Sequence, residues 1–199
     1  MNTKQYVGDL IGGSLFVAES RAVAELLLQQ PSLEDFNHVI VEDNLLQKNS
    51  PQTAKRYAKT IRTRIEPMGE AYLNALVTAN ETVARQLLLA AFLNNSPIAQ
   101  DFLRYSVADA RRAYQEKLSD FSWDDFFDER IRAFPELGKF SESSVKKMGN
   151  NLFKALADAG YIDTARKKQL RAVYIEPDVR ALLEQQGMTD VIKVMDSSA

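Results

Sequence analysis

The stretch of residues 83–93 is apolar on nearly all sides of a helix, and it limits the folds open to this chain more than any other feature. A helix of that kind must be buried all round, so we expect it to be the central element of the core. Elsewhere apolar residues recur at three- and four-residue spacing, and only eight glycines and six prolines interrupt the 199 residues. The sequence therefore predicts an all-α fold, with at most a short β-hairpin near residues 165–176.

The chain is long enough for one sizeable core or two small ones. The run Asn94-Asn95-Ser96-Pro97 combines polar turn residues with a Ser-Pro pair that can start a helix, so it is the best candidate for a linker. It divides the chain into two small helical domains, residues 1–94 and residues 95–199. Beyond it we expect one helix from Ile98 to about Tyr105 and another from Val107 to Leu118.

The segment from residue 48 to residue 64 is strongly basic, although the whole chain has a net charge of −2. It contains no acid and six cations, which are Lys48, Lys55, Arg56, Lys59, Arg62 and Arg64. Ser50 followed by Pro51 predicts a helix start, because the hydroxyl can cap a free N–H and proline is tolerated at the first helical position.

The two faces of this basic helix differ in character. Helical spacing predicts a buried stripe made of Ala54, Tyr57, Ala58, Ile61, Ile65 and Met68. Opposite the stripe, within about a third of the circumference, lie Gln52, Lys55, Arg56, Lys59 and Arg62. A helix with one buried face and one cationic face is suited to a nucleic-acid groove. A solvated charged face is the alternative, but such faces usually mix both signs of charge.

A second amphipathic helix precedes the basic one. Its apolar positions are Leu33, Phe36, Val39, Ile40 and Leu46, and Ser32 is placed to cap it. Only the short connection Gln47-Lys48-Asn49 then separates the two predicted helices. Two helices with a tight joint, the second one basic, predict a helix-turn-helix-like element in the N-terminal domain.

The run from Asn44 to Arg56, together with Gly12-Gly13-Ser14-Leu15, Glu19-Ser20 and the chain length, resembles the BrxA family, the small proteins of BREX phage-defence systems. The resemblance covers essentially the whole chain. It implies an all-helical, non-enzymatic nucleic-acid-binding component, likened both to RNA antitermination proteins and to DNA-binding helix-turn-helix modules. It also implies other BREX proteins as partners. It supplies no binding residues, so these are assigned from charge and helical phase.

The segment of residues 143–171 is a second basic region, with seven cations against two acids. Ser143 or Ser144 is placed to cap a helix that Gly160 closes. The basic run Arg166-Lys167-Lys168 follows, then a β-prone stretch, and Pro177 starts what we expect to be the last helix. This order resembles a small winged helix-turn-helix, and an ordinary basic loop is an equally good interpretation.

The two basic regions together supply the predicted nucleic-acid-binding residues. These are Lys48, Ser50, Gln52, Thr53, Lys55, Arg56, Lys59, Arg62, Arg64, Lys146, Lys147, Arg166, Lys167, Lys168 and Arg171. Trp123 and the tyrosines at 105, 114 and 161 are not interleaved with these cations as a single-strand stacking platform requires. Double-stranded DNA is therefore favoured over RNA. An RNA-binding antitermination-like factor and a protein-interaction scaffold within the defence complex are the alternatives.

Residues able to carry chemistry are few. His38 is the only histidine and there is no cysteine, so neither a zinc site nor a Ser–His–Asp arrangement has support. Asp124 and Asp128 stand four residues apart and could share a cation. The same residues fit the acidic first turn of a helix that buries Phe126 and Phe127. We favour the second interpretation and predict no catalytic residue, no metal, no cofactor and no enzymatic activity.

The composition also predicts the compartment. A chain without cysteine suits a reducing environment. No apolar run approaches the ~20 residues that span a bilayer, and no secretory signal begins the sequence. We therefore expect a cytoplasmic protein with no membrane contact.

Overall fold

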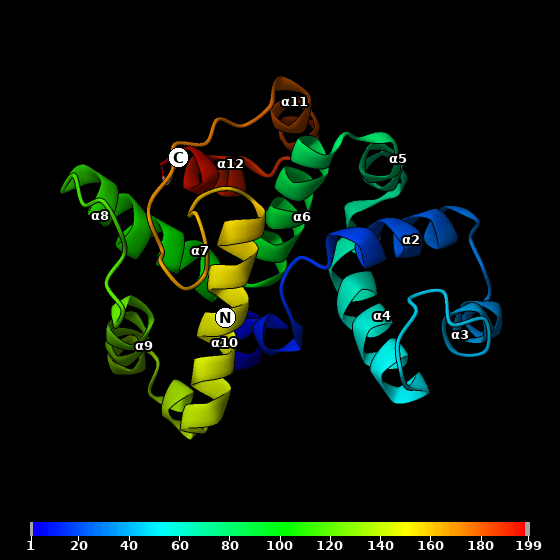
Figure 1. Ribbon diagram of the computed structural model, residues 1–199, viewed down its shortest axis with the longest axis horizontal. Helices are drawn as coiled ribbons and strands as arrows, with labels where there is room; N and C mark the ends of the chain where they lie inside the picture. The colour runs from blue at the N-terminus through cyan, green and yellow to red at the C-terminus, as the bar shows by residue number, and fades with distance from the viewer. Residues whose placement is uncertain (1, 198–199) are drawn as a thin grey trace.

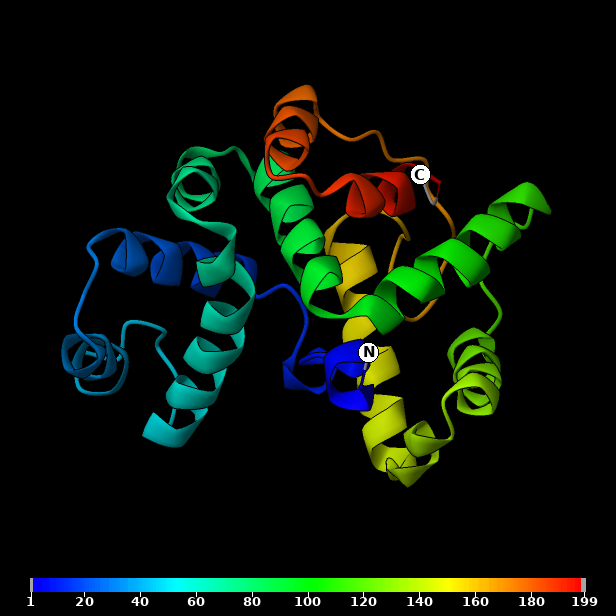
Figure 2. The same ribbon diagram turned by 180° about the vertical axis from the view of Figure 1, so that it is seen from behind.

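The computed structural model describes residues 2–197, and its regular secondary structure is helical throughout that range (Figure 1, Figure 2). The α-helices are α1 (Thr3–Val7), α2 (Val17–Leu28), α3 (Leu33–Val41), α4 (Pro51–Ile65), α5 (Glu70–Thr78), α6 (Glu81–Asn95), α7 (Pro97–Phe102), α8 (Ala108–Arg112), α9 (Ser122–Ala133), α10 (Glu142–Asp158), α11 (Pro177–Gln185) and α12 (Thr189–Ser197). Short 3₁₀ turns are η1 (Leu10–Gly12), η2 (Glu66–Met68) and η4 (Pro135–Lys139), and a π-helical turn, η3 (Leu103–Val107), joins α7 to α8. The predicted all-α fold is confirmed.

The helix α6 lies at the centre of the molecule, as the apolar run at 83–93 predicted. Its N-terminus is capped by Asn80, whose side chain accepts a hydrogen bond from the Val83 N–H at 3.0 Å. Every residue from 87 to 93 is buried. It contacts α2, α4 and α5 on one side and α7, α10, α11 and α12 on the other, so it is shared by two groups of helices.

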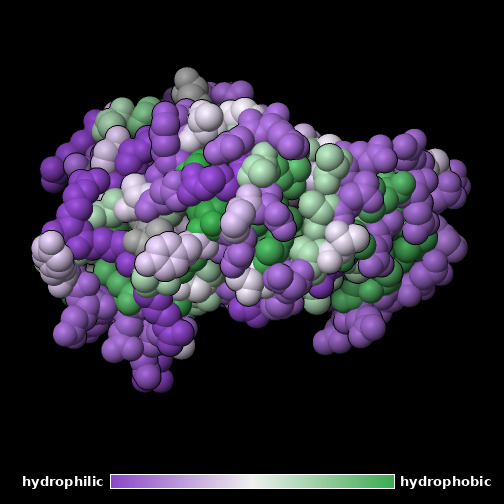
Figure 3. Space-filling model, turned by 90° about the horizontal axis from the view of Figure 1, so that it is seen from above, coloured by the Kyte–Doolittle hydropathy of each residue, from purple (hydrophilic) through white to green (hydrophobic). Residues whose placement is uncertain are grey.

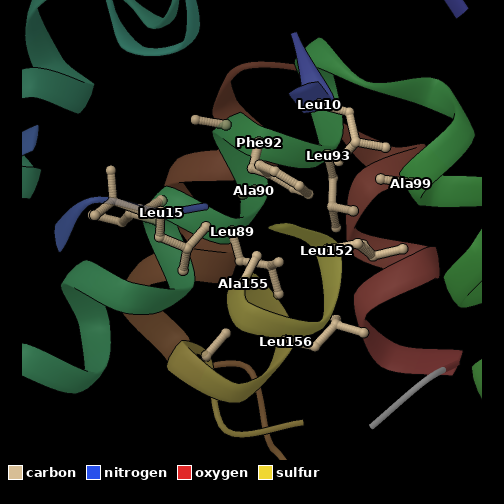
Figure 4. Close-up of a cluster of buried hydrophobic side chains, with 14 of the residues drawn as sticks. Leu10, Leu15, Leu89, Ala90, Phe92, Leu93, Ala99, Leu152, Ala155 and Leu156 are labelled. Carbon is tan, nitrogen blue, oxygen red and sulfur yellow. The ribbon is translucent and has the colours of Figure 1, made fainter. Parts of the chain in front are cut away.

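The core is built around this shared helix. Figure 4 shows Leu93 of α6 near Leu10 and near Leu152 of α10, and Leu89 of α6 near Ala155 of α10, all of them buried. Hydrophilic side chains cover most of the face that is seen from above in Figure 3. The apolar run at 83–93 therefore organises the fold by offering a buried surface to both helix groups.

The N-terminal segment, residues 8–14, crosses between the two groups and is fixed by polar contacts to both. The Asp9 N–H donates to Asn95 Oδ1 at 3.1 Å, and the Asn151 side-chain amide donates to the carbonyls of residues 10 and 11 at 2.8 and 3.2 Å. Gly8 has a φ of +59°, and a Cβ on it would lie 2.0 Å from the Asn95 carbonyl oxygen. Gly8 therefore allows the backbone of this segment to pack closely on the end of α6.

Replacing Gly8 with alanine is expected to lower the free energy of unfolding by about 2–4 kcal/mol, since it adds left-handed strain and a clash with fixed backbone. Gly187 is the matched control, because it also has a positive φ, +70°, but its Cβ would meet nothing within 4 Å. Urea denaturation of both variants separates the clash from the strain. Equal losses for Gly8→Ala and Gly187→Ala would contradict the close-packing argument.

Two predictions about the middle of the chain are corrected. The segments 98–105 and 107–118 do not form separate helices, because α7, η3 and α8 continue one another from Pro97 to Arg112. The predicted linker at 94–97 is a bend between α6 and α7, and Ser96 within it is fully buried. The division into two domains at this point stays a prediction.

The C-terminal third also differs in detail from the prediction. No β-strand forms within residues 2–197, so the hairpin near 165–176 is absent from that range, and the basic run lies in a loop. Isolated antiparallel bridges hold this loop, one between Ile162 and Leu170 and one between Lys117 and Gln169. The helix α10 is capped by Ser141 and not by the expected Ser143 or Ser144, and α12 follows the helix that starts at Pro177.

Candidate nucleic-acid interface

The helix α4 begins where the Ser-Pro pair predicted. Ser50 Oγ accepts a hydrogen bond from the Thr53 N–H at 3.2 Å and donates one to Thr53 Oγ1 at 2.9 Å. Ser50 and Thr53, both assigned to nucleic-acid contact, are thus hydrogen-bonded to each other at the N-terminus of α4. No acid lies in the first turn of α4, so the positive end of the helix dipole is not neutralised by its own residues.

The connection between α3 and α4 is longer than predicted. The helix α3 ends at Val41 and α4 begins at Pro51, so residues 42–50 separate them in place of a tight three-residue joint. The Asn44 side chain closes this loop, because it donates to the Lys48 carbonyl and accepts from the Lys48 N–H at 3.1 and 2.9 Å. Leu46 is buried from within the loop. The two helices still pack against each other, without the short turn of a helix-turn-helix.

The predicted phase of α4 is confirmed. Ala54, Ala58, Ile61 and Ile65 are buried. Tyr57 is half-buried and stacks on the Phe16 ring with 4.3 Å between ring centroids. The residues exposed on the outer face are Gln52, Lys55, Arg56, Lys59 and Thr63. The basic face therefore offers cations and polar groups but no free aromatic ring.

Three of the six cations in this region are already paired within the protein. Lys48 Nζ lies 2.6 Å from Glu19 Oε1. Arg62 forms a bidentate pair with Glu66, with Nε–Oε2 at 2.8 Å and Nη2–Oε1 at 2.6 Å. Arg64 pairs with Asp9, as described next.

The remaining three cations, Lys55, Arg56 and Lys59, form no ion pair with any described residue. All three side chains are exposed on the outer face of α4. The unneutralised charge of this face is thus about half of what the sequence count of six cations indicated.

The assignment of Arg64 to the binding surface is corrected. Its side chain is only 4% exposed and lies inside the protein. Its Nε is 2.9 Å from Asp9 Oδ1, its Nη2 donates to the Gly13 carbonyl at 2.8 Å, and its Nη1 donates to the Ser14 carbonyl. Burial raises the pKa of the Asp9 carboxyl against the opposing effect of Arg64. Arg64 therefore ties α4 to the N-terminal segment and does not reach an external ligand.

A groove of about 390 Å³ runs between α3 and α4. Its lining consists of Leu33, Phe36, Asn37, Ile40, Lys55, Ala58, Lys59, Arg62, Thr63 and Glu66. The groove has an apolar floor and a basic wall, and sequence reasoning missed it. On the α3 side the sequence pattern identifies Leu33, Phe36 and Ile40 only as a core stripe and does not single out Asn37. Glu66 lies just outside the basic segment.

The second basic region is more mixed in charge than the first. Lys146 and Lys147 are exposed on α10, and Arg166, Lys167 and Arg171 are exposed on the following loop. A cleft of about 270 Å³ brings Lys146 and Arg166 together, but Asp120 and Asp124 line the same cleft. Three of the predicted residues, Lys146, Arg166 and Lys168, therefore line one cleft together with acids.

The assignment of Lys168 to this surface is corrected. Its side chain is 10% exposed, and its Nζ donates to the Asp120 carbonyl at 3.3 Å and lies 3.4 Å from Asp120 Oδ1. The same ammonium lies 4.7 Å from the centre of the Phe153 ring. Lys168 thus holds the basic loop against α10 and the segment before α9.

The acidic cluster forms the start of α9, as favoured from the sequence. Asp124 and Asp125 lie in its first turn, and Phe126 and Phe127 are buried. Across residues 2–197, no group of three or more histidine, cysteine or acidic side chains is placed to hold a metal ion. His38 is exposed, with Nε2 3.8 Å from Asp43 Oδ1. The expectation that the chain is not an enzyme stays a prediction.

Within residues 2–197, no helix is both long enough and apolar enough to cross a membrane.

Comparisons with known proteins agree over almost the whole chain. A sequence model of the BrxA family matches residues 4–187. The chain is 44% identical over 195 residues to a protein of Escherichia coli (strain HS) named BREX protein BrxA, covering 98% of this chain and 92% of that protein. It is 30% identical over 198 residues to BREX protein BrxA of Paramagnetospirillum magneticum (strain AMB-1), covering 100% of each. Its fold is similar to the crystal structure of an uncharacterized protein from Magnetospirillum magneticum, with a TM-score of 0.87, 28% identity and coverage of 96% and 97%.

Proposed function

Because the chain belongs to the BrxA family of BREX phage-defence systems, we propose that it serves there as a non-enzymatic component that binds double-stranded DNA. The observation that carries this proposal is the outer face of α4. Lys55, Arg56 and Lys59 are exposed there and form no ion pair within the described part of the chain. Unpaired cations on one helix face attract the phosphates of a nucleic-acid backbone.

The chemistry of this face favours a duplex over a single strand. Proteins that bind single strands stack bases on exposed aromatic rings. Tyr57, next to Arg56 in the sequence, is already stacked on Phe16, and Phe36, which lines the groove with Lys55 and Lys59, is buried. Phosphate contacts therefore have to supply the affinity. Gln52, exposed in the first turn of α4, is placed to contact a base edge in a groove.

The second basic region is proposed as an auxiliary contact. Lys146, Lys147, Arg166, Lys167 and Arg171 are exposed, but Asp120 and Asp124 lie next to two of them. The acids lower the attraction of this region for phosphate. We therefore expect it to add less affinity than α4.

The test is a gel-shift assay with duplex DNA, single-stranded DNA and hairpin RNA at two salt concentrations. The proposal expects the tightest binding to the duplex and a steep fall in affinity as the salt concentration rises. Tighter binding to hairpin RNA would support the antitermination-like alternative. Absence of duplex binding at low salt would remove the proposal.

A protein-interaction scaffold within the defence complex is the second candidate function. Large exposed side chains away from α4 favour it, namely Tyr114, Phe121 and Tyr174 at 94%, 68% and 85% exposure. Exposed aromatic groups of this size are frequent anchors in protein interfaces. Replacing Tyr114 and Tyr174 with serine would then weaken association with a BREX protein, measured at high salt, and leave DNA binding unchanged.

A further inference from the structure

A row of charged residues runs along the outer face of α4 and ends in an acid, Glu66, which follows the last residue of the helix. Lys55, Lys59, Arg62 and Glu66 are separated by four, three and four residues, so they lie in one stripe along the helix. All four line the groove between α3 and α4. The row spans roughly 16 Å, at about 1.5 Å of rise per residue.

The last two members of the row neutralise each other. The Glu66 carboxylate accepts hydrogen bonds from both Nε and Nη2 of Arg62, at 2.8 and 2.6 Å. A phosphate group binds arginine with the same bidentate geometry. The guanidinium is further fixed over the Phe36 ring at 4.8 Å. Arg62 is therefore well oriented toward the groove, but a carboxylate occupies the edge that would hold a phosphate.

We propose that the groove between α3 and α4 is a phosphodiester-binding site in which Glu66 occupies the position of one phosphate and limits the affinity for DNA. This inference rests on the proposed function and adds to it a site and a residue that sets its strength. Lys55 and Lys59 are free to contact phosphates at once. Arg62 contributes only after a phosphate displaces Glu66 from its guanidinium.

Exposure of the pair makes such an exchange feasible. The side chains of Arg62 and Glu66 are 30% and 47% exposed, unlike the nearly enclosed Arg64. Solvent screens an exposed ion pair and weakens it, so a phosphate can compete with it. The Arg62–Glu66 pair is thus weak enough for a phosphate to displace Glu66. It is still strong enough to reduce the affinity of the groove for DNA.

The experiment measures duplex-DNA affinity against salt concentration for the full-length wild-type chain, Glu66→Gln, Arg62→Ala and the double variant. Glu66→Gln is expected to bind roughly eightfold more tightly at 0.1 M salt, with a log–log slope steeper by about 0.9, because one further phosphate contact becomes available. The gain should disappear in the Arg62→Ala background. Thermal unfolding of each variant confirms that the fold is kept.

A matched control separates this effect from a change in net charge. Glu70→Gln also removes one exposed acid, and Glu70 is neither in the groove nor in an ion pair with a described residue. Equal effects of Glu66→Gln and Glu70→Gln, or weaker binding by Glu66→Gln, would overturn the inference while the proposed function stands. Failure of the wild-type chain and of every variant to bind duplex DNA would instead remove the proposed function itself.

Discussion

Replacing Asp9 with asparagine is expected to lower the free energy of unfolding by about 3–5 kcal/mol, because it leaves a buried arginine without its counter-charge. The Arg64 guanidinium would keep its bonds to the carbonyls of Gly13 and Ser14, but these carry no full negative charge. Burial already lowers the pKa of Arg64, and the Asp9 carboxylate opposes that change. Urea denaturation of the wild type and the variant measures the loss.

Two comparisons sharpen this prediction. Glu81→Gln breaks the pair between Arg85 and Glu81, whose side chains are 43% and 60% exposed, and should cost less than about 1 kcal/mol. The double variant Asp9→Asn with Arg64→Met should lose less stability than the sum of the two single variants, since it leaves no unpaired charge. An Asp9→Asn protein as stable as the Glu81→Gln protein would show that Arg64 does not depend on Asp9.

Replacing Lys55, Arg56 and Lys59 together with alanine is expected to have the largest effect on binding. If each cation neutralises one phosphate, the log–log salt slope should flatten by about 2.7, that is, about 0.9 for each of three contacts. The affinity for duplex DNA at 0.1 M salt should fall by roughly two to three powers of ten. All three side chains are exposed, so the fold should survive.

The control for the triple variant in α4 removes three positive charges from other parts of the surface. Arg112, Lys139 and Lys193 are exposed cations, each paired with an exposed acid three residues away in the sequence. Their triple replacement by alanine also lowers the net charge by three and should leave the salt slope nearly unchanged. If both triple variants lose the same affinity, net charge alone governs binding and α4 is not the interface.

Sequence patterns predicted those elements whose determinants are local. The start of α4 followed from Ser50 and Pro51, its buried face from helical spacing, and the position of α6 from an apolar run that no exposed helix tolerates. These features depend on neighbours within one or two helical turns. They can therefore be read without knowledge of the fold.

The errors concern residues whose partners are distant in the sequence. The charge count places Arg64 in the basic segment, although the helical wheel leaves it out of the exposed arc, and its partner Asp9 lies 55 residues away. Lys168 is held by Asp120, 48 residues earlier. No sequence pattern within either basic segment indicates that Asp9 or Asp120 pairs with its cation.

The connection before α4 differs from the prediction for another reason. Leu46 continues the spacing of α3, so it predicted a longer helix than the one that forms. Asn44 and Gln47 adopt positive φ values of 49°, which end helical geometry, and the Asn44 side chain closes the loop on Lys48. A leucine can thus reach the core from a loop at a position that helical periodicity also allows.

The crossing segment at residues 8–14 has a consequence for how the chain is made. Its first anchor, Asn95, lies 86 residues after Asp9, and its second, Asn151, lies more than 130 residues after the carbonyls it binds. A ribosome emits the N-terminus first, so this segment stays without these anchors until α10 has emerged. The helix α4, joined to the segment by Asp9 and Arg64, acquires its final attachment only after Asn151, about three quarters of the way along the sequence, has emerged.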